Sequence, residues 1–99
     1  MKRAVERNSD AWVLMRHFKD PKFKPLYKAL PRHVRDLADK NFALLKQDPK
    51  HPSLRFKRIR DDVWSVRVGR SYRALAIEGS DGFQWFWIGS HADYDRLVS

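Results

Sequence analysis

Residues 63–78 read VWSVRVGRSYRALAIE, and this stretch decides the fold. Side chains alternate on both sides of Gly69 with the period of two that is typical of β-strands. Two such runs joined by a short turn predict an antiparallel hairpin, with strands over 63–68 and 73–78.

Similar runs lie on both sides of this hairpin. A strand is expected over 54–60, before the turn residues Asp61 and Asp62, and another over 83–88, after a turn that begins at Gly79 and ends at Gly82. The last run has apolar or aromatic side chains on both faces, which indicates a central strand. Four consecutive strands of this kind predict an antiparallel sheet.

The segments before and after these strands follow other patterns. Apolar residues at helical spacing predict a short helix over 23–30 and a second one from Pro31 to Asp48, which together form a helical hairpin. A short apolar run predicts a strand over 11–17, and residues 1–10 predict a basic arm. Ser90 and Asp93 match a capping box, which predicts a final short helix.

Together these elements predict an α+β fold. An N-terminal strand and a two-helix hairpin pack on an antiparallel β-sheet, and a short helix ends the chain. The length of 99 residues predicts a single domain over 1–99, since a second hydrophobic core has no room.

Composition restricts the functional class. The chain has no cysteine, which excludes disulfides, thiolate zinc sites and cysteine nucleophiles and favours a cytoplasmic protein. Its apolar runs are too short for a membrane span or a signal peptide, so we expect neither anchoring nor secretion. A net charge of +9 attracts polyanions, and nucleic acid is the abundant one in the cytoplasm. The alternative is a lysine-rich surface without a specific partner.

Three strings of the sequence carry a resemblance to a known family. They are DPKHPSLRFKRI at 48–59, VWSVRVGRSYRAL at 63–75 and WIGSHADY at 87–94. The chain resembles the RelE/ParE superfamily of bacterial toxins from about residue 23 to its C-terminal end. The resemblance implies the toxin of a type II toxin–antitoxin system, neutralised by a cognate antitoxin. It further implies mRNA cleavage on the ribosome for the RelE branch, and inhibition of DNA gyrase for the ParE branch.

The resemblance also assigns positions to individual residues. By motif position, Arg67 matches a basic residue of the middle strand, Arg73 matches the arginine of a tyrosine–arginine pair, and Lys57 matches the basic strand that enters the site. The best-known RelE members differ from this chain at two positions. They have an arginine in place of His91 and a lysine in place of Ser65, although other ribosome-dependent relatives use a histidine near the last strand.

The residue types suit RNA cleavage by the 2′-hydroxyl of the substrate, which needs a proton acceptor, a proton donor and cations around the phosphate. Ser90 would place His91 in the first turn of the last helix, where the macrodipole disfavours imidazolium and free N–H groups favour phosphate. Arg67 and Arg73 would supply charge stabilisation. Tyr94, one turn from His91, would stack on a base or orient the phosphate. The predicted catalytic set is therefore His91, Arg73, Arg67 and Tyr94.

Each catalytic assignment has a plain structural alternative. His91 is also a reasonable surface residue on a capped turn, and Arg67 a solvated arginine on an open strand face. Arg73 begins a face that is otherwise apolar, so an ion pair with Asp61 or Asp62 is the competing explanation for it.

Four further cations complete the predicted RNA-binding surface: Lys57, Arg55, Arg58 and Arg70. For Lys57 and Arg55 the alternative is a charged edge strand that guards against aggregation, and Tyr94 is as well suited to packing as to binding. The histidines lack metal-ligand spacing and no glycine-rich phosphate loop is present, so we expect neither a metal nor a small-molecule cofactor. The expected partners are an antitoxin, mRNA and the ribosome. A gyrase inhibitor and a binding module without catalysis remain alternative functions.

Overall fold

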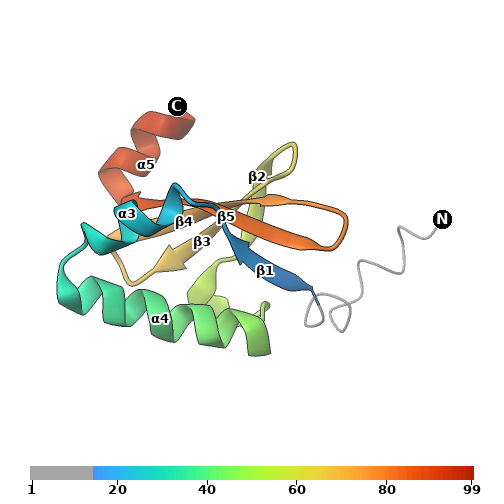
Figure 1. The fold of residues 1–99 in the computed structure, drawn as a ribbon, viewed down its shortest axis with the longest axis horizontal. Helices are drawn as coiled ribbons and strands as arrows, with labels where there is room; N and C mark the ends of the chain where they lie inside the picture. Colours follow the sequence, from blue (N-terminus) through green and yellow to red (C-terminus); the bar gives the residue numbers. More distant parts are fainter. Residues whose placement is uncertain (1–14) are drawn as a thin grey trace.

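The computed structural model describes residues 15–99, which form a five-stranded sheet with helices on both sides (Figure 1). In chain order the elements are β1 (Arg16–Lys19), α3 (Phe23–Lys28), α4 (Arg32–Gln47), the 3-10 helix η1 (Pro52–Leu54), β2 (Lys57–Arg60), β3 (Val63–Val68), β4 (Tyr72–Glu78), β5 (Gly82–Ser90) and α5 (His91–Val98). The predicted α+β fold is confirmed. The predicted arm over 1–10, and residues 11–14 of the predicted first strand, lie outside the described residues.

The sheet has the strand order β1-β5-β4-β3-β2. Strands β2 to β5 form the expected antiparallel meander, whereas β1 joins the free edge of β5 in parallel, with Arg16 opposite Gly82. The two backbones approach so closely here that a Cβ at Gly82 would lie 2.3 Å from the carbonyl oxygen of Arg16. A period of two shows that a segment is a strand, but it carries no information on the direction of the neighbouring strand.

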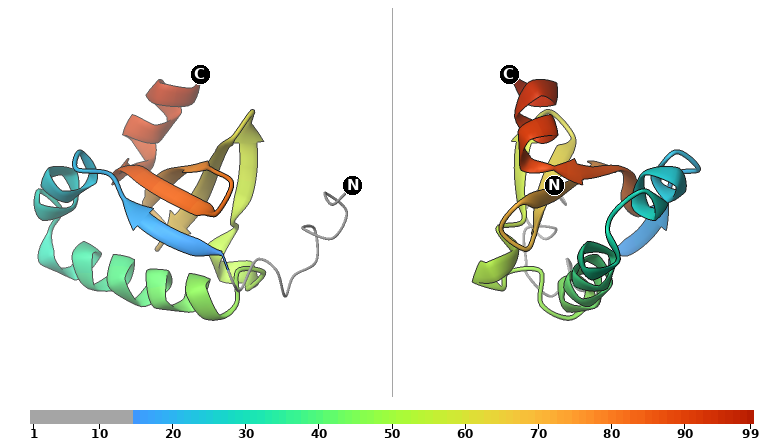
Figure 2. Two further views of the ribbon diagram at one scale, coloured as in Figure 1. Left: turned by 45° about the vertical axis from the view of Figure 1, so that its right-hand side comes forward. Right: turned by 90° about the vertical axis from the view of Figure 1, so that its left-hand side faces the viewer.

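Helix α4 lies under one face of the sheet, and α5 rises on the opposite side from the end of β5 (Figures 1 and 2). Alternation along β3 turns Trp64, Val66 and Val68 towards the α4 side, where the hydrophobic core forms. The core consists of Phe23, Leu30, Val34, Leu45, Leu54, Trp64, Val66, Val68, Ala74, Ala76, Phe83, Trp85 and Ile88. We call these two sides the helix face and the open face.

A bulge in β5 explains why this strand is apolar on both sides. The register with β4 shifts between Leu75 and Ala76, so Trp87 pairs with Leu75 while Trp85 pairs with Ala76. The two tryptophans therefore lie on different faces although they are two residues apart. Trp85 is buried in the core, whereas Trp87 is half-buried on the open face.

The strand predicted over 54–60 begins only at Lys57. The reason is local, because the backbone N–H of Ser53 donates to Nδ1 of His51 and starts η1. This turn carries Leu54 into the core, and Arg55 then ends it in the left-handed backbone region, with φ of 46°. The prediction of Arg55 as a strand residue is therefore wrong.

Candidate functional site

The predicted catalytic residues meet on the open face, at the end of the sheet where α5 begins. In the β3–β4 register Arg67 lies directly opposite Arg73, and Lys57 of β2 lies opposite Ser65 of β3. Paired residues of antiparallel strands point to the same face, so all four side chains belong to the open face. Two arginines opposite one another repel, which indicates a place suited to an anion.

Arg73 is held between the sheet and α5. Its side chain is only 8% exposed, and its Nε–H donates to Oγ of the fully buried Ser65 at 2.9 Å. The guanidinium carbon lies 5.0 Å from the centre of the Tyr94 ring, a cation–π contact. Burial lowers the pKa of Arg73, and the neighbouring cations Arg67 and Arg55 lower it further.

Arg73 does not form the alternative ion pair with Asp61 or Asp62. Its side-chain contacts are Ser65 and Tyr94. Asp95 of α5 raises the pKa of Arg73, against the larger effect of burial, which lowers it.

The start of α5 fixes His91. Oγ of Ser90 accepts from the backbone N–H of Asp93 at 3.1 Å, as the capping box predicts, although the Asp93 carboxylate contacts Arg96. The backbone N–H of His91 donates to the carbonyl oxygen of Ser71 in the β3–β4 turn at 2.7 Å. Two elements therefore hold the His91 backbone in place beside the start of β4.

The His91 side chain is 49% exposed and lies near two other side chains of its helix. Nδ1 is 3.4 Å from Oδ1 of Asp95, an ion pair when the ring is protonated. The imidazole also meets the Tyr94 ring edge-on, with 5.8 Å between ring centres. Tyr94 thus contacts both His91 and Arg73, so the three side chains form one continuous cluster.

The four predicted RNA-binding cations lie in three different parts of the fold: the end of η1, β2 and the β3–β4 turn. Lys57 shares the open face, and Arg55 is close enough to Arg73 to lower its pKa. Arg58 pairs with Trp64, so its side chain starts on the helix face of the edge strand β2, and its part in RNA binding stays a prediction. Arg70 lies in the exposed β3–β4 turn, where it lines a shallow groove with Arg67.

Ser65 belongs to this cluster, and its place there was not predicted from the sequence. The resemblance marks it only as a departure from related toxins, and its sequence neighbours do not indicate a contact with Arg73. One signal was available, because Ser65 stands between Val63 and Arg67 on the same face of β3. A small hydroxyl residue at the centre of a strand is poorly suited to packing, and that suggests a buried hydrogen-bond acceptor.

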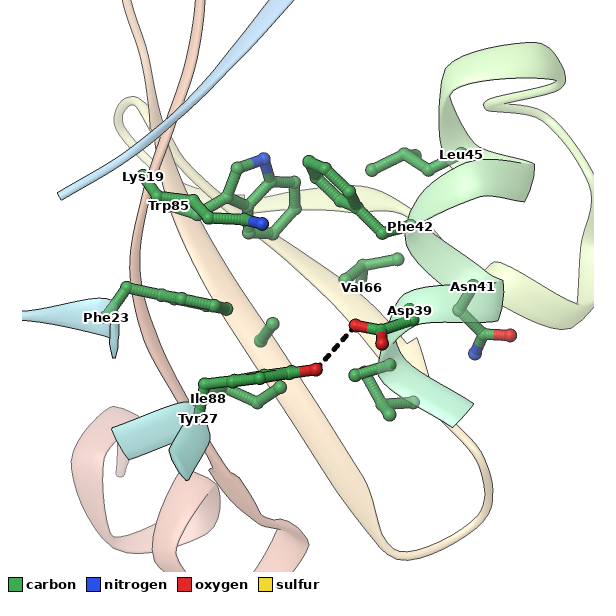
Figure 3. Close-up of a pocket in the computed structure, with 13 residues that line it drawn as sticks. Lys19, Phe23, Tyr27, Asp39, Asn41, Phe42, Leu45, Val66, Trp85 and Ile88 are labelled. Carbon is green, nitrogen blue, oxygen red and sulfur yellow. Dashed lines mark hydrogen bonds between the residues drawn. The ribbon is translucent and has the colours of Figure 1, made fainter. Parts of the chain in front are cut away.

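A pocket between α3, α4 and the sheet lies on the other side of the molecule (Figure 3). Most of its walls are apolar residues of the core or packed against it, and among the lining residues the Tyr27 hydroxyl donates to Oδ1 of Asp39 at 2.7 Å. That hydrogen bond raises the pKa of Tyr27. Lys19 lies at the same rim with its ammonium 4.8 Å from the centre of the Phe42 ring. This pocket lacks a grouping of base and cations comparable to that around Arg73.

Two further searches of residues 15–99 gave negative findings. No cluster of three or more histidine, cysteine or acidic side chains in this part of the chain could hold a metal ion. No helix within it is both long and apolar enough to cross a membrane.

The sequence of this chain matches one known protein family. The family model described as the ParE-like toxin domain matches residues 32–96. No sequence among the curated proteins matches the chain significantly.

Several solved structures have a similar fold, including the following three. The RelB–RelE antitoxin–toxin complex of Methanococcus jannaschii aligns with a TM-score of 0.61 and 16% identity, over 83% of this chain and 99% of that chain. YafQ of E. coli strain BL21(DE3) aligns with a TM-score of 0.63 and 11% identity, over 86% and 99%. A copper-bound mutant toxin of Helicobacter pylori aligns with a TM-score of 0.56 and 13% identity, over 80% and 97%. At these identities the likeness concerns the fold.

Proposed function

Because the chain belongs to the ParE-like toxin domain family, we propose that it is the toxin of a toxin–antitoxin pair and acts as a metal-independent endoribonuclease. Its substrate is mRNA, cut on the ribosome, and the result is inhibition of translation. The observation that carries the proposal is the cluster around Arg73. A desolvated guanidinium lies opposite a second arginine, and one tyrosine connects it to an accessible histidine.

The arginines account for phosphate binding in this proposal. Arg67 and Arg73 face one another, and like charges at this spacing are relieved when a phosphate lies between or above them. Burial of Arg73 strengthens its attraction for an anion, since water screens the charge less. The negative charge that develops on the phosphate during cleavage is therefore met by fixed cations.

His91 accounts for proton transfer. In its neutral form it accepts the proton of the attacking 2′-hydroxyl, whose oxygen forms the new bond to phosphorus as the bond to the 5′-oxygen breaks. The resulting imidazolium forms the ion pair with Asp95 and can return the proton to the leaving 5′-oxygen. The products are a 2′,3′-cyclic phosphate and a free 5′-hydroxyl. Tyr94 orients the phosphate or stacks on a base.

A cognate antitoxin and a cytoplasmic site of action belong to the same proposal. One of the structures with a similar fold is an antitoxin–toxin complex, which supports an antitoxin partner for this chain. The exposed apolar side chains of Ile77 on β4 and Leu97 on α5 would give it apolar contact area.

A second candidate function is inhibition of DNA gyrase without RNA cleavage. It is favoured by the family model, whose description is ParE-like, and the same fold serves both activities. In that case the cations of the open face would bind a protein surface or DNA, and His91 would have no role in proton transfer.

The test compares both activities in the same purified protein. We expect mRNA to be cut in a ribosome-programmed reaction, with cyclic-phosphate ends and undiminished activity in EDTA, while gyrase continues to supercoil plasmid DNA. Intact mRNA together with blocked supercoiling would establish the gyrase reading instead. Salt-dependent RNA binding with neither activity would leave only a binding module.

A further inference from the structure

Ser65 occupies an unusual position for a polar residue. It lies at the centre of β3 with no exposed surface, between the open-face residues Val63 and Arg67. A buried hydroxyl needs a hydrogen-bond partner, and Ser65 has one in the Nε–H of Arg73. Ser65 and Arg73 are also the two buried polar residues of the described part of the chain, so one contact accounts for both.

The contact with Ser65 determines how Arg73 can meet a ligand. A guanidinium has five N–H donors in a rigid plane, and Ser65 takes the one on Nε. The Tyr94 ring lies against the same guanidinium and limits its rotation. The two Nη amino groups at the far end of the plane then remain for a ligand, and their spacing matches two oxygens of one phosphate.

We propose that Ser65 is a positioning residue, which holds the Nε–H of Arg73 so that both Nη groups are presented end-on to two oxygens of a single phosphate. This inference rests on the proposed function, because the phosphate is the scissile one of RNA. Ser65 does not touch the substrate and acts through Arg73. If Ser65 had a purely structural role, replacing it could destabilise the protein. Variants that still fold would then bind phosphate as well as the unaltered chain.

The first experiment titrates inorganic phosphate into the purified full chain and follows binding by NMR. Ser65→Ala is expected to weaken binding about fivefold to tenfold, the usual net effect of losing one intramolecular hydrogen bond. Ser65→Cys, nearly equal in shape but a weak acceptor, is expected to behave in the same way and serves if the alanine variant does not fold. Ser80→Ala, in the exposed β4–β5 turn, is the matched control.

A double-mutant cycle separates positioning from structure. Lysine has no Nε–H of the arginine type, so in an Arg73→Lys background Ser65→Ala should cause no further loss of phosphate binding. In the cleavage assay Ser65→Ala should lower kcat more than it raises KM, because the phosphate gains charge in the transition state. Melting curves identify variants that are folded.

The outcomes distinguish this inference from the proposed function. Unaltered phosphate binding by both folded Ser65 variants would overturn it, and so would equal losses with and without Arg73. Absence of phosphate binding by the unaltered chain would overturn it as well. Weakened phosphate binding by Ser65→Ala in a protein that leaves mRNA intact would support the role of Ser65 while the endoribonuclease proposal fails.

Discussion

The two faces of the sheet are built from the same strands but have opposite chemistry. On the helix face, α4 and α3 cover the sheet and the core is apolar, with Trp64, Val66 and Trp85 among its members. On the open face the short α5 is the only helix among residues 15–99, and there the side chains of Ser65 and Arg73 are buried together. Alternation places every second residue in each environment, so one face can provide stability and the other can provide a site.

The excess of positive charge is larger in residues 16–50 than in residues 51–99, which carry the candidate site. Net charge therefore does not locate the site. Residues 16–50, which include β1 and both helices of the hairpin, hold ten lysines and arginines against four aspartates. Residues 51–99 hold eight cations against six carboxylates, and two of these carboxylates lie in α5 close to His91. The open face is therefore distinguished by the burial and fixed orientation of Arg73, since a few ordered cations bind a phosphate better than many solvated ones.

The largest effect is expected on the open face, with His91→Ala. Loss of the proton-transfer group should reduce the cleavage rate roughly 10²- to 10⁴-fold with little change in RNA affinity, and it should alter the pH profile. Melting temperature should stay the same, because the side chain is half exposed. His33→Ala, at an exposed position of α4, is the control. A folded His91→Ala variant that cuts at the unaltered rate would remove His91 from the mechanism and leave Tyr94, Lys57 or the arginines.

The second prediction concerns stability and a substitution in the core on the helix face. Leu45→Ala should lower the free energy of unfolding by about 2–5 kcal/mol, because the side chain is 1% exposed and its removal leaves a cavity. Urea denaturation measures the loss. Leu97→Ala, at a side chain that is 54% exposed on α5, should change stability by at most about 0.5 kcal/mol. If Leu45→Ala reduced cleavage per folded molecule as strongly as His91→Ala, the two faces would not be functionally separate.

The smallest effect concerns His17 of β1, which packs against Phe83 and Trp85 on the helix face. Its Nδ1 accepts from Nε1–H of Trp85 at 3.0 Å. Burial, and then the nearby ammonium of Lys46, lower the pKa of His17 from 6.5 to about 4. Between these values the unfolded chain binds a proton that the folded chain does not, so stability falls as the pH drops from 6.5 to about 4.

The expected loss over this window is about 1–2 kcal/mol, less than the full shift implies because water partly screens the ring. Urea denaturation at several pH values measures it. The loss should be smaller in His17→Gln and undiminished in His33→Gln, so that carboxylate titration common to all three proteins cancels. An equal pH dependence in His17→Gln would show that His17 is not the group responsible.

Periodicity predicted the strands and helices well where one face of an element is buried. The strand over 63–68 was predicted with the bounds that the structure has, and the helix that follows Pro31 ends at Gln47 as the Asp48-Pro49 pair indicates. The start of β2 was missed because a side chain, Nδ1 of His51, competes for the backbone and forms η1. The parallel direction of β1 was not predicted, since it depends on which edge of the sheet is free.

The candidate site was predicted in its membership more than in its arrangement. The resemblance and the capping box together led to His91, Tyr94 and Arg73, and the structure brings these three side chains together. The contact between Ser65 and Arg73 was beyond prediction, because it depends on the β3–β4 register and on how far α5 covers the strand. The different position of Arg58 follows from the same register. Residue type indicates which chemistry is available, and register determines which groups meet.

The parallel pairing of β1 with β5 also affects the order of folding. Strands β2 to β5 are joined by tight turns, so their pairing is local and forms quickly, whereas β1 must close a loop of about 60 residues to reach Gly82. We therefore expect β1 to dock after the rate-limiting barrier has been crossed. Contacts that form so late slow unfolding without speeding folding, so the four residues of β1 govern the lifetime of the folded chain rather than the speed of its formation.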